Sequence, residues 1–288
     1  MSKFDFINKI EERNPFLQVL ILICIGLVAS VVLGSIAVSL YSSFTDVNLI
    51  EYPLSMSKEQ PILFMIVNQV PFQVGMFLIP GLIYRQFQRS KSNFQTGNAL
   101  WGVVLFGVMV LLLPFLTEIN TWVLEKLNML EGAMQVKSQS DSLIENLVSG
   151  QETSVFISTL IVIGIITGFA EEFFFRGFVY DHLAVNSGNK WLAIVVSASF
   201  FAVLHFNYVQ ILPLLSFGVA LALIYEFSGS IYLGAALHAL NNVLNLYWLY
   251  TEDYPSFMED HNWIVTSVGL GALLVLLFLK RTELSLKA

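Results

Sequence analysis

Eight long apolar stretches occupy most of the chain, and they constrain its fold more than any other feature. Each is close to the roughly 20 residues that a helix needs to cross a bilayer. They lie at about residues 17–42, 61–84, 99–123, 154–180, 190–206, 209–227, 230–250 and 262–279. Within a bilayer the backbone must satisfy its own hydrogen bonds, and a helix does so. We therefore expect an all-α fold: a polytopic membrane bundle of about eight transmembrane helices.

The composition agrees with a chain that is solvated by lipid. Only 12% of the 288 residues are charged and 56% are hydrophobic, whereas soluble proteins carry about 25% charged residues. No Gly/Ser-rich linker or internal repeat marks a second domain. We expect a single integral membrane domain at 17–280, between a cytoplasmic N-terminal segment at 1–16 and a cytoplasmic tail at 281–288.

The basic residues predict the orientation of the bundle. With the N-terminus in the cytoplasm, eleven of the fourteen Lys and Arg residues fall in cytoplasmic segments, and only Lys58, Lys126 and Lys137 fall outside. This bias places both termini in the cytoplasm and suits a bacterial inner (cell) membrane. The net charge of -7 reflects acidic outer loops, so we expect no nucleic-acid partner. Within these outer parts, residues 127–148 fit either an amphipathic surface helix or an ordinary loop.

Two adjacent carboxylates and an arginine interrupt the fourth apolar stretch. Charged groups at the centre of a membrane helix cost about 2.5 to 3.5 kcal/mol each on insertion scales, and they usually mark function. On a helix Glu172 and Arg176 share a face, so the arginine can neutralise that carboxylate, while Glu171 points about 100° away and is the freer base. The alternative is that the span ends near Ala170 and both carboxylates face water.

Histidines mark two further polar clusters in the C-terminal half. His205 ends a stripe that also contains Ser197 and Phe201, although a lone histidine there also suits an interfacial or hydrogen-bonded core position. His238 and Asn242 lie one helical turn apart in the seventh apolar stretch. Their alternative role is interhelical hydrogen bonding, which His and Asn supply in membranes.

Taken together, the three clusters suggest hydrolysis of an acyl bond by water. A carboxylate base, a histidine and a His/Asn pair that donates to an oxyanion are the groups that such a reaction needs. A zinc ion held by Glu171, His205 and His238 would serve the same reaction with a metal-bound water. The single cysteine, Cys24, lies far away in the sequence and allows no intrachain disulfide.

A non-catalytic membrane protein is the competing interpretation. One form is a proton-coupled transporter that relays protons through the buried Glu and His residues, and the other is a peptide-binding immunity scaffold that does not cleave. Transporters more often show repeat symmetry and paired broken helices, whereas the polar groups here gather in one half of the chain.

The three clusters resemble the motifs of the CAAX prenyl protease and bacteriocin-processing family, also called CPBP or Abi. The matching motifs are Glu171-Glu172-x-x-x-Arg176, Phe201-x-x-x-His205 and His238-x-x-x-Asn242, in this order on successive helices. The resemblance covers about residues 155–250. It implies an eight-helix intramembrane endopeptidase with a cavity open to the membrane, in which Glu172 and Arg176 shape the site and balance its charge.

The same resemblance implies roles for the remaining motif residues. Glu171 would activate the attacking water together with His205, and His238 and Asn242 would stabilise the oxyanion. The family has been described both as metalloproteases and as metal-independent glutamate proteases, so zinc at Glu171, His205 and His238 stays open. We expect the partners to be the lipid bilayer and a membrane-anchored protein or hydrophobic peptide as substrate.

Overall fold

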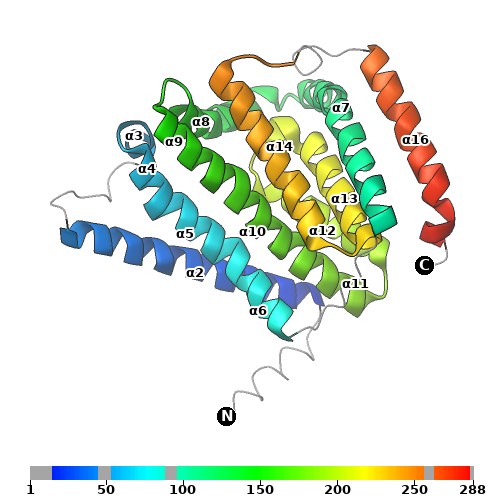
Figure 1. Cartoon of the computed structure of the whole chain (residues 1–288), viewed down its shortest axis with the longest axis horizontal. Coiled ribbons are helices and arrows are strands. Elements are labelled where there is room, and N and C mark those ends of the chain that lie inside the picture. Colours follow the sequence, from blue (N-terminus) through cyan, green and yellow to red (C-terminus); the bar gives the residue numbers. More distant parts are fainter. Residues whose placement is uncertain (1–14, 45–52, 88–95, 256–262, 286–288) are drawn as a thin grey trace, which may run out of the picture.

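The computed structural model describes residues 15–44, 53–87, 96–255 and 263–285. Most of the predicted N-terminal segment at 1–16 and the end of the predicted tail at 281–288 lie outside these residues. Throughout the described part the chain is helical and contains no strand. The prediction of an all-α, polytopic helical bundle is confirmed (Figure 1).

Each of the eight apolar stretches forms a helix or a run of consecutive helical segments. Five helices in the described residues are long and apolar enough to cross a membrane by length and composition, and two shorter apolar ones lie at Lys190–Leu204 and Trp263–Leu279. α14 (Ile231–Thr251) is also long, but it carries His238 and three asparagines, which lower its hydropathy. The other single helices are α2 (Pro15–Phe44), α7 (Thr96–Lys126), α12 (Lys190–Leu204), α13 (Ile211–Ser228) and α16 (Trp263–Ser285).

Two of the long helical runs change their winding along their length. The second apolar stretch contains α4 (Pro61–Phe64), η1 (Met65–Gln69), α5 (Val70–Phe72), η2 (Gln73–Leu78) and α6 (Ile79–Phe87). The fourth contains α9 (Thr153–Thr159), η3 (Leu160–Ile166), α10 (Thr167–Phe174), η4 (Phe175–Tyr180) and α11 (Asp181–Ser187). The η segments named here are π-helical, a winding that often occurs at functional sites. α10, which carries both glutamates of the first motif, therefore lies between two π-helical segments.

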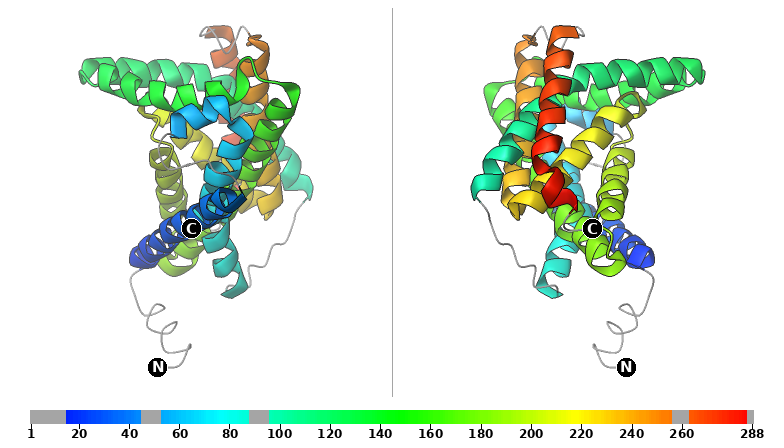
Figure 2. Two further views of the ribbon diagram at one scale, coloured as in Figure 1. Left: turned by 90° about the vertical axis from the view of Figure 1, so that its left-hand side faces the viewer. Right: turned by 90° about the vertical axis from the view of Figure 1, so that its right-hand side faces the viewer.

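Shorter elements gather at one end of the bundle. α3 (Pro53–Glu59), α8 (Leu130–Val148) and the start of α9 lie at the end opposite to α11 and the last turns of α6 (Figure 1). α8 crosses this end at a steep angle to the long helices (Figure 2). Residues 127–148 thus form mainly a helix, which decides between the two interpretations that the sequence allowed.

The interior of the bundle is rich in phenylalanine around the motif arginine. Phe174, Phe175, Phe178 and Phe201 are fully buried, and their rings pack edge to face. α12 and α13 approach closely beside them, because a Cβ at Gly218 would lie 3.1 Å from the Cα of Ala198. Aromatic rings of this kind bury large apolar areas and fix the geometry of their neighbours.

Candidate active site

The charged residues of the first motif lie inside the bundle. Glu171 is 5% exposed, Glu172 1% and Arg176 0%, and the helical run continues past them to Ser187. This burial excludes the alternative in which the span ends near Ala170 and the carboxylates face water. Because buried charges need partners, their hydrogen bonds decide what each of them can do.

Glu172 and Arg176 form a buried ion pair, as their spacing predicted. Arg176 Nη1 donates to Glu172 Oε1 at 2.6 Å, and Arg176 Nη2 donates to the backbone carbonyl of Gly218 at 2.8 Å. The guanidinium carbon also lies 5.1 Å from the centroid of the Phe201 ring. The arginine therefore connects η4 to both α12 and α13.

Glu172 has a second partner, which is the histidine of the third motif. His238 Nδ1 lies 3.0 Å from Glu172 Oε1. A carboxylate only accepts, so this contact assigns the hydrogen to Nδ1. The other ring nitrogen, Nε2, is directed toward Glu171, with its nearest carboxylate oxygen at 3.9 Å. An Arg176–Glu172–His238 chain thereby fixes the orientation of this imidazole.

His205 approaches the same carboxylate from another helix. It follows the last residue of α12, and its Nδ1 donates to the backbone carbonyl of Phe201 at 2.7 Å. The neutral ring then carries a lone pair on Nε2, which lies 3.8 Å from Glu171 Oε2. The His205 side chain is 30% exposed, compared with 3% for His238. His205 therefore lies on the accessible side of the site.

The Nε2 atoms of the two imidazoles thus converge on a single oxygen. Glu171 Oε2 is buried and has no hydrogen-bond partner within the described residues. Glu171 is the carboxylate that the helical geometry identified as the freer base. A buried acceptor without a partner is costly in a folded protein, and this oxygen can accept a hydrogen bond from a bound water or ligand.

A tight approach of two helices positions these groups. A Cβ at Gly168 would lie 2.8 Å from the backbone nitrogen of Ala239 and 2.9 Å from its Cα, so α10 and α14 are in backbone contact. One turn before His238 on α14, a Cβ at Gly234 would lie 3.4 Å from Glu172 Oε2. The small residues of both helices therefore bring His238 within reach of Glu172.

A zinc ion at this site would be held by Glu171, His205 and His238. Among the described side chains, no group of three or more His, Cys, Asp and Glu residues is arranged to hold a metal ion. Glu171, His205 and His238 come together, but as placed they do not meet the requirements of such a group.

Asn242, the last motif residue, lies one turn after His238 on α14. Its side chain is partly buried, and it makes no hydrogen bond to any residue that the structure describes. An amide in this state keeps both of its donors available for a ligand.

Asn120 is a structural residue that the sequence analysis did not single out. Its side chain is buried, Nδ2 donates to the carbonyls of Tyr208 and Val209 at 2.9 and 2.8 Å, and Oδ1 accepts from the backbone nitrogen of Leu212 at 3.1 Å. It holds the turn between His205 and α13. A lone asparagine in the third apolar stretch was the only signal in the sequence, and its partners are about 90 residues away.

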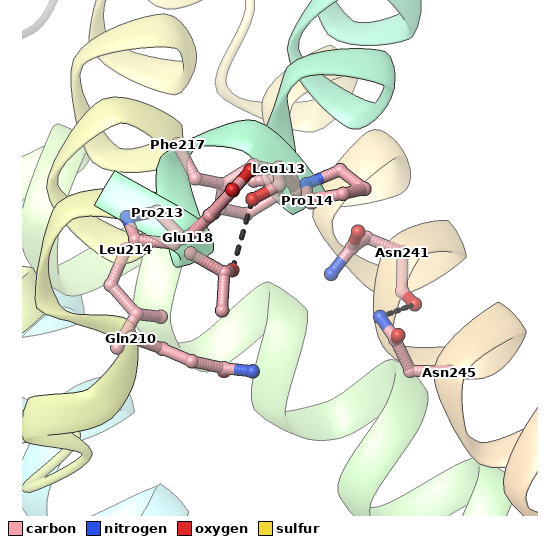
Figure 3. A pocket seen from close by; sticks show the side chains of 10 residues that line it. Leu113, Pro114, Glu118, Gln210, Pro213, Leu214, Phe217, Asn241 and Asn245 are labelled. Atoms are coloured by element: carbon pink, nitrogen blue, oxygen red, sulfur yellow. Dashed lines mark hydrogen bonds between the residues drawn. The ribbon is translucent and has the colours of Figure 1, made fainter. Parts of the chain in front are cut away.

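A polar cavity adjoins the site between α7, α13 and α14 (Figure 3). Its volume is about 490 Å³. The residues that line it are Leu113, Pro114, Thr117, Glu118, Gln210, Pro213, Leu214, Phe217, Asn241 and Asn245. Phe217 also contacts the catalytic candidate His238, with ring centroids 5.5 Å apart. The cavity and the site therefore share a wall.

Comparison with known proteins shows one family similarity. Residues 153–244 match the family model described as type II CAAX prenyl endopeptidase, Rce1-like. The matched segment, 92 of 288 residues, contains every residue of the three motifs. No curated protein and no solved structure matches the chain. Over residues 153–244 the chain is therefore similar to the CAAX-type intramembrane proteases, which agrees with the resemblance to the CPBP family that the three motifs carry.

Proposed function

We propose that the protein hydrolyses a peptide bond of a membrane-anchored protein or hydrophobic peptide with water activated by Glu171 and His205. The observation that carries this proposal is the convergence of two imidazole Nε2 atoms on Glu171 Oε2, at 3.8 and 3.9 Å. A water molecule that donates to this oxygen lies within reach of both rings. Such an arrangement supplies general base catalysis, which contributes about 10² to 10⁴-fold.

The reaction follows from the hydrogens assigned above. As the water oxygen bonds to the carbonyl carbon, its proton passes to the Glu171 carboxylate or to the lone pair of His205 Nε2. The electrons of the carbonyl π bond move to oxygen and form an oxyanion. When the bond to nitrogen breaks, the same proton passes to the leaving amine, which restores the carboxylate and the neutral imidazole.

We assign stabilisation of the oxyanion to His238 and Asn242. In its imidazolium form His238 donates from both nitrogens, with Nδ1 on Glu172 and Nε2 toward the reacting group. Preorganised donors of this kind are usually the largest electrostatic contribution to acyl transfer.

A route without metal is the one that we propose. It is supported by the convergence of His205 Nε2 and His238 Nε2 on Glu171 Oε2, at 3.8 and 3.9 Å. We place the protein in a bacterial inner (cell) membrane with both termini cytoplasmic, on the basis of the bias in Lys and Arg. The bilayer and a substrate anchored in it are then its partners.

The test compares the unmodified protein with Glu171→Gln and Glu226→Gln. Glu226 is a partly buried carboxylate that binds Lys190 and Tyr180 away from the site, so its variant controls for the loss of a charge. The detergent-purified proteins are incubated with a pool of lipid-anchored and hydrophobic peptides, and new peptide ends are identified by mass spectrometry. We expect Glu171→Gln to lose at least about 10²-fold in rate and Glu226→Gln to keep its activity.

Two results would contradict this proposal. Full activity of Glu171→Gln would favour a scaffold or transporter, because a non-catalytic site tolerates a change that keeps its shape. Loss of cleavage in a chelator, restored by added zinc, would replace the metal-free route by a metal-dependent one at the same residues.

A further inference from the structure

The chain changes conformation directly after His205. α12 ends at Leu204, and His205 caps it with a helical backbone conformation. Phe206 then adopts a left-handed conformation with a φ of 51°, which is unfavourable for a residue with a side chain. The 3₁₀-helix η5 (Tyr208–Gln210) follows and leads into α13. A strained turn of this kind persists only when its surroundings hold it in place.

Asn120 of α7 holds this turn by three hydrogen bonds. Its Nδ2 atom donates to the carbonyls of Tyr208 and Val209, and its Oδ1 atom accepts from the backbone nitrogen of Leu212. The Asn120 side chain is 2% exposed. Since the loss of such a side chain leaves buried backbone groups unsatisfied, these bonds are costly to break. They fix η5 and the start of α13 to α7.

An apolar contact supports the polar one. Leu124 lies about one helical turn after Asn120 on α7. It forms a small buried cluster with Val209 and with Ala133 of α8. The turn after His205 is therefore held by α7 and α8, which carry none of the three motifs.

The position of this turn matters for the proposed reaction because His205 lies at its start. The bond from His205 Nδ1 to the carbonyl of Phe201 sets the direction of the ring, and Nε2 lies 3.8 Å from Glu171 Oε2. One water molecule can contact both groups only while this distance is kept. A displacement of about 1 Å at a reacting group can lower a rate by about 100-fold.

We propose that Asn120 is a positioning residue for catalysis, which fixes η5 to α7 and thereby keeps His205 Nε2 at the distance from Glu171 that one water molecule bridges. Asn120 acts through His205 and does not touch the reacting atoms. This inference rests on the proposed function, because it assigns a further residue to the same reaction.

Asn98 provides a matched control on the same helix. It lies near the start of α7, and its Nδ2 atom donates to the carbonyl of Phe227 near the end of α13, at 2.9 Å. Asn98→Ala therefore removes a hydrogen bond between the same two helices and leaves the turn after His205 in place.

The structural part can be tested without a substrate. Phe206 is exposed, so in a Cys24→Ser background a spin label is attached to the thiol of Phe206→Cys, and its mobility is measured by electron paramagnetic resonance. We expect Asn120→Ala to increase the mobility of the label and Asn98→Ala to leave it unchanged. Asn120→Ser, which keeps a donor and an acceptor, should give a smaller increase.

The catalytic part uses a peptide that the unmodified protein cleaves. We expect Asn120→Ala to lower kcat about 10- to 100-fold and to change KM by less than about threefold, because it displaces a reacting group. Asn98→Ala should keep kcat within about twofold. In a His205→Ala background, Asn120→Ala should lower the remaining rate by less than about twofold, since residues that act through one another are not additive. A purely structural role would give the same loss in both backgrounds.

The outcomes separate this inference from the proposed function. Unchanged label mobility or unchanged kcat in Asn120→Ala, an equal loss in Asn98→Ala, or a full additional loss in the His205→Ala background would overturn the inference and leave the proposed function intact. If Asn120→Ala does not yield folded protein, Asn120→Ser decides by the same measures. Full activity of His205→Ala, or no cleavage by the unmodified protein, would show that the proposed function is wrong, and the role of Asn120 falls with it.

Discussion

At the scale of single residues, Glu172 binds two partners in the site through one oxygen atom. Its Oε1 atom accepts from Arg176 at 2.6 Å and from His238 at 3.0 Å, and the ion pair is completely buried. By contrast, Glu226 and Lys190 pair near the surface, where their side chains are 15% and 40% exposed. The Glu172–Arg176 pair and the Glu226–Lys190 pair thus differ mainly in how deeply they are buried.

The difference in burial predicts different losses of stability. Glu172→Gln leaves the Arg176 guanidinium buried without a counter-charge, and breaking a buried pair costs about 3 to 5 kcal/mol. Glu226→Gln should cost less, because the Lys190 side chain is 40% exposed and water can replace the lost ion pair there. Denaturant-induced unfolding in mixed detergent micelles measures both. Equal losses for the two variants would show that the Arg176–Glu172–His238 chain does not stabilise the fold.

At the scale of elements, the site depends on one helix contact. The backbones of α10 and α14 touch at Gly168 and Ala239, and this contact sets the distance between Glu172 and His238. Since the close neighbours of Gly168 are backbone atoms, no side-chain rotation can make room for a methyl group there. Gly107 in α7 differs, because a Cβ at that position would meet nothing within 4 Å.

The two glycines form a matched pair of alanine substitutions. Gly168→Ala should separate α10 from α14, lower the stability by about 1 to 3 kcal/mol as overpacking does, and reduce the cleavage rate at least tenfold. Gly107→Ala should keep full activity and gain up to about 1 kcal/mol from the higher helix propensity of alanine. Thermal inactivation and cleavage rates of the two variants provide the measurement. An active, stable Gly168→Ala protein would refute the role of this contact.

At the scale of the whole molecule, the two ends of the bundle contain different helix ends and different numbers of basic residues. α8 and the start of α9 lie at one end of the bundle, and α11 lies at the other (Figure 1). The bias in Lys and Arg predicts that the α11 end is cytoplasmic. The cavity lies toward the α8 end of the bundle. Its lining includes Gln210, which directly precedes α13, and residues in the second half of α7, the helix that leads into α8.

This orientation can be measured with single cysteines in a Cys24→Ser background. Ser138→Cys lies on the exposed side of α8, and Ser187→Cys ends α11. A membrane-impermeant maleimide should label Ser138→Cys in intact cells, and it should label Ser187→Cys only after the membrane is permeabilised. The reverse pattern would show that the bundle is inverted and that the cavity opens to the cytoplasm.

The sequence by itself determined the elements and the chemistry. Hydropathy placed the helices, because lipid-solvated segments must be apolar and must satisfy their own backbone hydrogen bonds. The i, i+4 spacing predicted the Glu172–Arg176 pair, and burial in an apolar run identified Glu171 and the two histidines as candidates. These inferences need only local geometry and the cost of burying charge, which the order of residues contains.

The tertiary structure decided which of these groups meet. That His238 contacts Glu172 through Nδ1 and faces Glu171 through Nε2 depends on the register of two helices separated by 66 residues in the sequence. The same applies to Asn120, which holds the turn after His205, and to the cavity that contains Glu118. Hydropathy predicts that a helix is buried. It does not predict how the helix is rotated about its axis or which helices lie beside it. The rotation and the neighbours are set by the packing of side chains and glycines between helices, and such contacts exist only in the folded bundle.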